Sequence, residues 1–221
     1  MIKALIFDFD GLILDTETPE FRCWQDIYRE YGFELPPDRW GSIIGGGGHS
    51  DFDAAEHLST LTRGRLDPAA LRDRNRLESG EVIHAQGPLP GVMDYLDEAK
   101  RLGLKLAIAS SSDYAWVQSH CERIGLFHHF DEVVTAENVG FGRTKPNPDL
   151  FLTALSRLKV QKEEAIVFED SPNGVKAANR AGVFVVAVPN AVTSLLAIEG
   201  ANLILKTLSD LSLSELMDKV K

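Results

Sequence analysis

The chain has 221 residues, 44% of them hydrophobic and 25% charged, which suits a globular protein with one sizeable core and a small accessory domain. Its 33 Asp and Glu outnumber its 23 Lys and Arg, and the formal net charge of −10 argues against nucleic acid or an anionic membrane as a partner. The cysteines Cys23 and Cys121 are far apart and lack metal-ligand spacing, which argues against a zinc site and a disulfide framework. The apolar run at the N-terminus is too short for a signal peptide or a membrane span, and we expect a cytoplasmic protein. Nothing indicates an obligate dimer, so we expect a monomer.

The first strand is predicted over residues 2–7, and Asp8-Phe9-Asp10-Gly11 follows it directly. Side chains two residues apart share one face of a strand, so the carboxylates of Asp8 and Asp10 point into the same small volume. They repel each other unless a cation lies between them or one of them takes up a proton, which indicates a metal or an acid/base site. The alternative is a strand that ends in solvated aspartates, because Asp and Gly are ordinary turn residues. The tetrapeptide alone leaves both interpretations open.

A helical insertion follows the first strand. Aromatic and aliphatic side chains recur at three- and four-residue spacing over 21–31, which predicts an amphipathic helix. We interpret this stripe as the core of a small domain rather than as a substrate-stacking surface. Further helices are predicted over 54–62 and 68–77, and no strand is predicted before about residue 104. The insertion therefore spans about residues 15 to 80.

The run Gly45-Gly46-Gly47-Gly48 invites comparison with phosphate-binding loops. It lacks the Gly-Lys-Ser/Thr ending of a P-loop and the spaced glycines of a dinucleotide fold, and it lies within the helical insertion. We interpret it as a flexible cap loop. The sequences at 14–16 and 86–91, which flank the insertion, are predicted hinges.

From about residue 90, helices and strands alternate to the end of the chain, which predicts a parallel, doubly wound sheet. The predicted strands are 104–109, 133–135, 165–168, 183–188 and 201–205, and the predicted helices are 92–102, 114–124, 148–158, 175–181 and 213–220. The fold class is therefore α/β: a doubly wound, Rossmann-like parallel-sheet core with a small all-helical cap domain inserted after the first strand. The core takes residues 1–14 and 84–221, and the cap takes residues 15–83.

Polar side chains of complementary kinds lie where later elements end or begin. Ser110 follows the second strand, Lys145 stands just before a predicted helix, and Glu169 and Asp170 follow another strand. In an open parallel sheet the carboxyl ends of the strands face one crevice, where ligands bind. Each residue also has a plain structural interpretation. Ser110, Glu169 and Asp170 could cap helices, and Lys145 could be an ordinary surface lysine.

These motifs, in this order, resemble the haloacid dehalogenase (HAD) superfamily, and within it the β-phosphoglucomutase-like branch. The resemblance rests on Asp8-Phe9-Asp10-Gly11, Ser110, Lys145-Pro146 and Glu169-Asp170-Ser171, followed by Gly174, Ala177, Ala178, Ala181 and Gly182. It implies a magnesium-dependent phosphatase that acts on a small phosphorylated metabolite, a sugar phosphate, through an aspartyl-phosphate intermediate.

The resemblance also implies a role for each site residue. Asp8 is the nucleophile, and Asp10 protonates the leaving alkoxide and then activates the hydrolytic water. Ser110 donates to the transferring phosphoryl group, and Lys145 balances the charge on that group and on the nucleophile. The ligands expected for Mg²⁺ are Asp8, Asp170 and the backbone carbonyl of Asp10, with Glu169 joining directly or through water.

Two other functions stay open at this point: a phosphomutase of the β-phosphoglucomutase type, and a catalytically silent protein that binds a phosphorylated metabolite. Silent relatives are expected to lose an acid or the lysine, and Asp8, Asp10, Lys145 and Asp170 are all present. The mutase has a histidine after the first cap turn, whereas Glu20 stands at that position in this chain. Because its negative charge does not favour a second phosphate beneath the cap, we expect hydrolysis rather than isomerisation.

Overall fold

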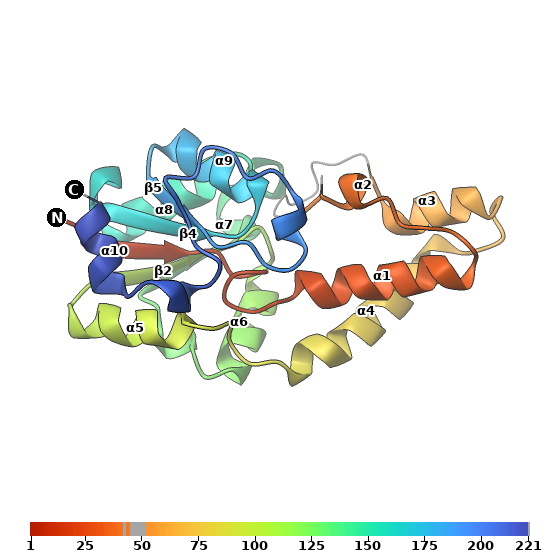
Figure 1. Cartoon of the computed structure of the whole chain (residues 1–221), viewed down its shortest axis with the longest axis horizontal. Helices are drawn as coiled ribbons and strands as arrows, with labels where there is room; N and C mark the ends of the chain where they lie inside the picture. Colours follow the sequence, from red (N-terminus) through yellow and green to blue (C-terminus); the bar gives the residue numbers. More distant parts are fainter. Residues whose placement is uncertain (42, 45–51, 221) are drawn as a thin grey trace.

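The computed structural model describes residues 1–41, 43–44 and 52–220, which form an α/β core with a helical extension (Figure 1). The strands are β1 (Ala4–Phe7), β2 (Lys105–Ala109), β3 (Glu132–Val134), β4 (Ala165–Glu169), β5 (Phe184–Ala187) and β6 (Leu203–Ile204). They form one parallel sheet in the order β3-β2-β1-β4-β5-β6. The predicted doubly wound sheet is confirmed. Because β1 pairs with both β2 and β4, the carboxyl ends of these three strands lie side by side.

Strand β1 is buried on both faces. Leu5 and Phe7 pack into one hydrophobic cluster, and Ala4 and Ile6 pack into another on the opposite face. This arrangement is typical of a parallel strand with helices on both sides of its sheet. The first cluster is lined by α5 (Val92–Arg101), α6 (Tyr114–Arg123) and α10 (Leu213–Lys219), and the second by α8 (Asp149–Leu158) and α9 (Pro172–Ala181). Across the described residues, no helix combines the length and the apolar character needed to cross a bilayer.

The predicted helical insertion after β1 is confirmed. Its helices are α1 (Glu17–Glu30), α2 (Pro37–Gly41), α3 (Ala54–Leu61) and α4 (Pro68–Ala85), which extend away from the sheet in Figure 1. Phe21, Trp24, Ile27 and Tyr28 of α1 are at most 6% exposed and belong to a third hydrophobic cluster, separate from the two beside the sheet. The stripe on α1 is therefore core, as predicted, although Tyr31 at its end is 41% exposed.

Helix α4 continues past the predicted end at Leu77 to Ala85. Glycine lowers helix propensity, so the sequence predicts an end before Gly80. Tertiary packing overrides that preference, because Ser79 and Ile83 are only 4% and 3% exposed and Ile83 packs into the core cluster beside the sheet. The helix therefore runs from the cap to Ala85, directly before the predicted hinge at 86–91.

Other differences concern short elements. Helices α2 and α7 (Ala136–Val139) were not predicted, because runs of this length carry no periodic signal. The last strand is shorter than the predicted 201–205; it lies at the sheet edge, where Ile204 is 56% exposed. The Gly45–Gly48 run lies outside the described residues, so its interpretation as a cap loop stays a prediction.

Candidate active site

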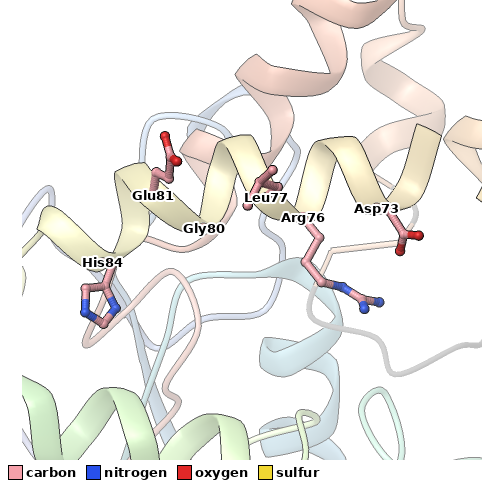
Figure 2. A pocket seen from close by; sticks show the side chains of 6 residues that line it. All are labelled: Asp73, Arg76, Leu77, Gly80, Glu81 and His84. Atoms are coloured by element: carbon pink, nitrogen blue, oxygen red, sulfur yellow. The ribbon is translucent and has the colours of Figure 1, made fainter. Parts of the chain in front are cut away.

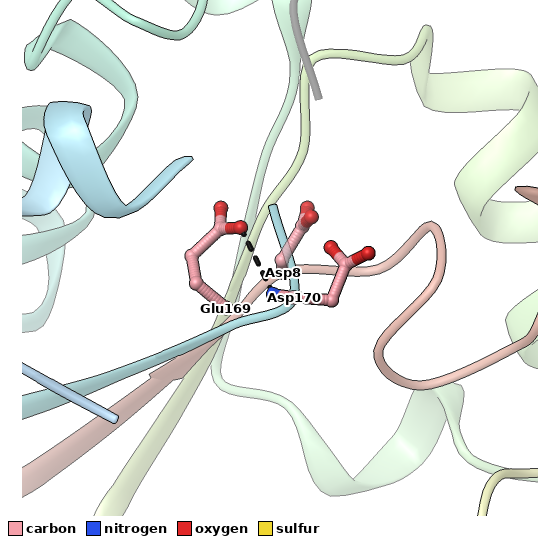
Figure 3. Close-up of side chains that lie close together, drawn as sticks. All are labelled: Asp8, Glu169 and Asp170. Carbon is pink, nitrogen blue, oxygen red and sulfur yellow. Dashed lines mark hydrogen bonds between the residues drawn. The ribbon is translucent and has the colours of Figure 1, made fainter. Parts of the chain in front are cut away.

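Three acidic side chains meet at the carboxyl ends of β1 and β4 (Figure 3). Asp8 follows β1, Glu169 ends β4, and Asp170 comes next. One carboxylate oxygen from each residue lies within 4.8 Å of the others, and all three residues are at most 3% exposed. The parallel register that pairs Phe7 with Phe168 aligns the residues that follow the two strands. This pairing brings acids from distant parts of the sequence into one cluster.

Lys145 lies between two of these acids. Its Nζ atom is 2.6 Å from Oδ1 of Asp8 and 2.6 Å from Oε1 of Glu169. The residue is fully buried, and its Nζ atom also lies 5.4 Å from the centre of the Phe151 ring. A buried ammonium group requires charged partners. Lys145 is therefore not the ordinary surface lysine that the sequence alone allows.

The site holds more buried acid than Lys145 can neutralise. Desolvation, and next the charge of Glu169, raise the pKa of Asp8 from 3.8 to about 8 against the opposing effect of Lys145. Desolvation and the charge of Glu17 raise the pKa of Asp170 well above its ordinary value, and burial raises the pKa of Glu17 itself to about 8. Burial opposes the charged form of Lys145, but the charges of Asp8 and Glu169 outweigh it and raise the pKa of the lysine. The cluster therefore favours the uptake of protons or of a divalent cation.

The acid cluster has the donor chemistry of a magnesium site. Oδ1 of Asp170 is buried and has no hydrogen-bond partner among the described residues, a costly state for a carboxylate oxygen that a hard cation relieves. In Glu169, by contrast, Oε1 contacts Lys145, and Oε2 accepts from the backbone N–H groups of Asp170 and Ser171 at 3.2 and 3.3 Å. Asp8 and Asp170 thus fit direct ligation of a cation better than Glu169 does.

The carboxylate of Asp10 accepts four side-chain hydrogen bonds. Oδ1 accepts from Oγ1 of Thr16 at 3.0 Å and from Nε1 of Trp116 at 2.8 Å. Oδ2 accepts from the hydroxyls of Ser110 and Ser112 at 3.1 and 2.6 Å. Asp10 is not among the acids that lie close enough to share one ion in the described part of the chain. The predicted metal ligand from Asp10 is therefore its backbone carbonyl and not its carboxylate.

Ser110 does not cap α6, which was the structural alternative that the sequence left open for it. Asp113 caps α6, because its Oδ1 accepts from the backbone N–H of Trp116 at 2.8 Å. The hydroxyl of Ser110 is directed at Asp10 instead, and the residue is 1% exposed. Ser110 therefore lies within the site, beside the predicted acid/base residue.

Sequence reasoning missed several residues of the site, among them Asn190 and Glu17. The Nδ2 atom of Asn190 donates to Oδ2 of Asp170 at 2.8 Å and to Oε2 of Glu17 at 2.9 Å. Asn190 comes shortly after β5, so the rule that polar residues at strand ends face one crevice could have found it. Glu17 is the first residue of α1 and follows no strand, so it carries no such signal.

An open pocket of about 780 Å³ lies along α4 and is lined by Asp73, Arg76, Leu77, Gly80, Glu81 and His84. Figure 2 shows the side chains of Arg76 and His84 on the same side of this helix. The ring of His84 lies 6.4 Å from that of His120, which in turn lies 4.2 Å from the ring of Trp116. The pocket thus borders the α6 side of the site. It contains none of the predicted catalytic residues, so the catalytic centre lies elsewhere.

A doubly wound parallel sheet, a helical insertion after its first strand, and buried acids with a lysine at its carboxyl edge together define a hydrolase of the haloacid dehalogenase class. The chain belongs to the haloacid dehalogenase-like hydrolase family, which it matches over residues 5–188. The resemblance drawn from the motifs is confirmed. The protein is an enzyme of this family, and its homologues include phosphatases.

The chain is similar to known proteins over nearly its whole length. YhcW of Bacillus subtilis (strain 168) is 44% identical over 218 residues, which cover 99% of this chain and 97% of that protein. Fructose-1-phosphate phosphatase YqaB of Escherichia coli (strain K12) is 33% identical over 188 residues, which cover 84% of this chain and 95% of YqaB. The crystal structure of β-phosphoglucomutase from Clostridium difficile matches with a TM-score of 0.73, at 23% identity, over 100% of this chain and 97% of that one. At this identity, the match to the β-phosphoglucomutase structure shows that the two proteins share a fold.

Proposed function

We propose that the protein is a magnesium-dependent phosphatase that hydrolyses a small sugar phosphate through an aspartyl-phosphate intermediate. The observation that carries the proposal is the contact of Asp8 with the buried Lys145, beside an Asp170 oxygen that has no hydrogen-bond partner among the described residues. A carboxylate that receives a phosphoryl group needs a fixed orientation and nearby positive charge. Lys145 supplies both to Asp8, and a divalent cation held by the acid cluster adds to the positive charge.

The reaction follows from the residues present. Asp8 attacks phosphorus in line with the leaving oxygen, so that the bond to Asp8 forms as the bond to the sugar oxygen breaks. Asp10 gives a proton to the leaving alkoxide and then takes one from the water that attacks the aspartyl phosphate, which releases Asp8. Ser110 donates its hydroxyl to a phosphoryl oxygen, and Lys145 balances the charge. When bound at Asp8 and Asp170, Mg²⁺ neutralises negative charge on the transferring group.

A sugar phosphate is the favoured substrate class because YqaB, one of the relatives, is named for its action on fructose 1-phosphate. The net charge of −10 repels an anionic substrate at long range, so binding depends on positive charge at the site itself. Lys145 supplies that charge where the phosphoryl group reacts, and a divalent cation held by Asp8 and Asp170 would add to it.

Hydrolysis is favoured over phosphomutase activity by the residue at the start of the cap. Glu20 lies in the first turn of α1 with its side chain exposed, and the charge of Asp10, after desolvation, contributes to the raised pKa of its carboxyl group. Carboxyl groups at both positions repel a second phosphate that a mutase must hold beneath its cap. Phosphorus NMR with β-glucose 1-phosphate and a trace of its 1,6-bisphosphate distinguishes the two activities. Glucose 6-phosphate that accumulates faster than inorganic phosphate would establish the mutase.

The proposal is tested by phosphate release from a panel of phosphorylated metabolites, with and without Mg²⁺. We expect turnover of at least one sugar phosphate that requires the cation and is lost in Asp8→Asn, because an amide cannot act as the nucleophile. Asp26→Asn is the matched control, since Asp26 is an exposed residue of α1 paired with Arg29. Full activity in a pure preparation of Asp8→Asn would exclude the proposed chemistry.

A further inference from the structure

The indole of Trp116 has its polar atom directed at the predicted acid/base residue. Its Nε1 atom lies 2.8 Å from Oδ1 of Asp10, although the two residues are 106 positions apart in the sequence. The ring packs against His120 at a centroid distance of 4.2 Å, one turn further along α6. The backbone N–H of Trp116 is bonded to the capping residue Asp113. Both the ring and the backbone of Trp116 are therefore held in place.

Trp116 differs in kind from the other donors to Asp10. Thr16, Ser110 and Ser112 donate through hydroxyl groups, which can rotate toward another acceptor and can also accept hydrogen bonds. An indole N–H can only donate. Because it cannot turn away without leaving its contact with His120, its bond to Asp10 persists when a phosphoryl group takes the hydroxyl of Ser110.

The two oxygens of Asp10 are thereby made unequal. Oδ1 accepts from the indole of Trp116, which can only donate, and from the hydroxyl of Thr16, so Trp116 makes Oδ1 the less favourable oxygen for a proton and Oδ2 the more favourable one. Oδ2 faces two serine hydroxyls, which can accept that proton's hydrogen bond or move away. This asymmetry selects one oxygen for proton transfer.

We propose that Trp116 is a positioning residue that holds Oδ1 of Asp10, so that Oδ2 carries the proton in both halves of the reaction. The inference rests on the proposed phosphatase function. In the first half, Oδ2 gives its proton to the sugar oxygen as the bond between that oxygen and phosphorus breaks. In the second half, Oδ2 takes a proton from water as the water oxygen bonds to phosphorus and the bond to Asp8 breaks. Asp10 then carries the proton for the next turnover.

The hydrogen bond is tested directly by the side-chain ¹H–¹⁵N spectrum of the three tryptophans. The Trp116 signal is identified by its loss in Trp116→Phe. We expect its indole proton to lie downfield of the other two, and to shift upfield in Asp10→Asn, because an amide group then replaces the carboxyl group whose Oδ1 accepts from the indole. An indole signal that Asp10→Asn leaves unchanged would overturn the proposal.

The catalytic consequence is tested by kinetics of Trp116→Phe with fructose 1-phosphate and Mg²⁺, or with the sugar phosphate that the metabolite panel selects. We expect kcat to fall by about 10- to 100-fold, the effect of one hydrogen bond to a charged group, while KM changes by less than about 2-fold. Trp24→Phe is the matched control, because Trp24 is a 5% exposed tryptophan of the cap core. A merely structural role of Trp116 predicts a lower unfolding temperature with unchanged kcat in the folded enzyme, and that result would overturn the proposal.

The two proposals fail in different ways. If the wild-type protein releases phosphate from nothing in the panel, or Asp10→Asn is as active as the wild type, the proposed function is wrong. If the wild type is active, Asp10→Asn is not, and Trp116→Phe keeps full kcat, only the role of Trp116 is wrong.

Discussion

Replacing Asp8, the proposed nucleophile, should stabilise the metal-free protein by an amount that grows with pH. The pKa of Asp8 is about 8 in the folded protein, against an ordinary value of 3.8. Between these two values the folded state binds a proton on Asp8 that the unfolded chain has lost. Folding stability therefore falls as the pH rises through this window, because unfolding releases the proton of Asp8 and a higher pH favours that release.

The magnitude follows from the size of the shift. Each pH unit inside the window corresponds to about 1.4 kcal/mol of stability. Between pH 5.5 and 7.5 the free energy of unfolding of the wild type should therefore fall by up to about 3 kcal/mol, because the unfolded chain releases the proton of Asp8. Asn has the same shape and no proton to lose, so Asp8→Asn avoids this cost. Lys145 does not become an unpaired buried charge, because Oε1 of Glu169 remains 2.6 Å from its Nζ atom.

The assay is urea unfolding in excess chelator at pH 5.5, 6.5 and 7.5, with Asp26→Asn as the exposed control. We expect the stability of Asp8→Asn relative to the wild type to rise with pH, by up to about 3 kcal/mol between pH 5.5 and pH 7.5. Saturating Mg²⁺ should narrow the gap at pH 7.5, because the wild-type carboxylate then has a cation to bind. A variant that is less stable than the wild type at pH 7.5, or a difference that does not vary with pH, would refute the reasoning.

Three further predictions concern residues around the cluster. Lys145→Met removes the buried cation and should lower the free energy of unfolding by about 3–5 kcal/mol, measured by the same urea titration at pH 7.5; a loss below about 1 kcal/mol would contradict the pairing. A methyl group on Gly174 would overlap the carboxyl group of Glu169, so Gly174→Ala should be strongly destabilising. Gly80 lies in an open position of α4, so Gly80→Ala should raise the free energy of unfolding by about 0.5–1 kcal/mol. Equal effects of the two glycine variants would show that the close approach is absent. Asn190→Ala should weaken Mg²⁺ binding by about 10- to 100-fold in calorimetry, because it frees Asp170, the proposed metal ligand, to turn. Unchanged affinity would show that Asn190 does not orient Asp170.

The sequence by itself determined the sheet, the helical insertion and the residues that end the central strands. Apolar runs followed by Asp8, Ser110 and Glu169 were enough, because parallel strands direct their carboxyl ends to one edge whatever the details of packing. The spacing of apolar residues on α1 likewise predicted the face that is buried. These features depend on the periods of strand and helix, which the chain carries locally.

Only the tertiary structure decided which side chains of the site form hydrogen bonds with one another. Asn190 reaches Asp170 and Glu17, and Trp116 reaches Asp10, across long stretches of sequence. Each contact depends on how one helix or loop is rotated against the sheet, and no local pattern records that rotation. The same holds for α4, which runs through a glycine because its far end is buried against the core. Periodicity thus predicts which edge of the sheet carries the site, whereas packing between distant elements determines which atoms of that site meet.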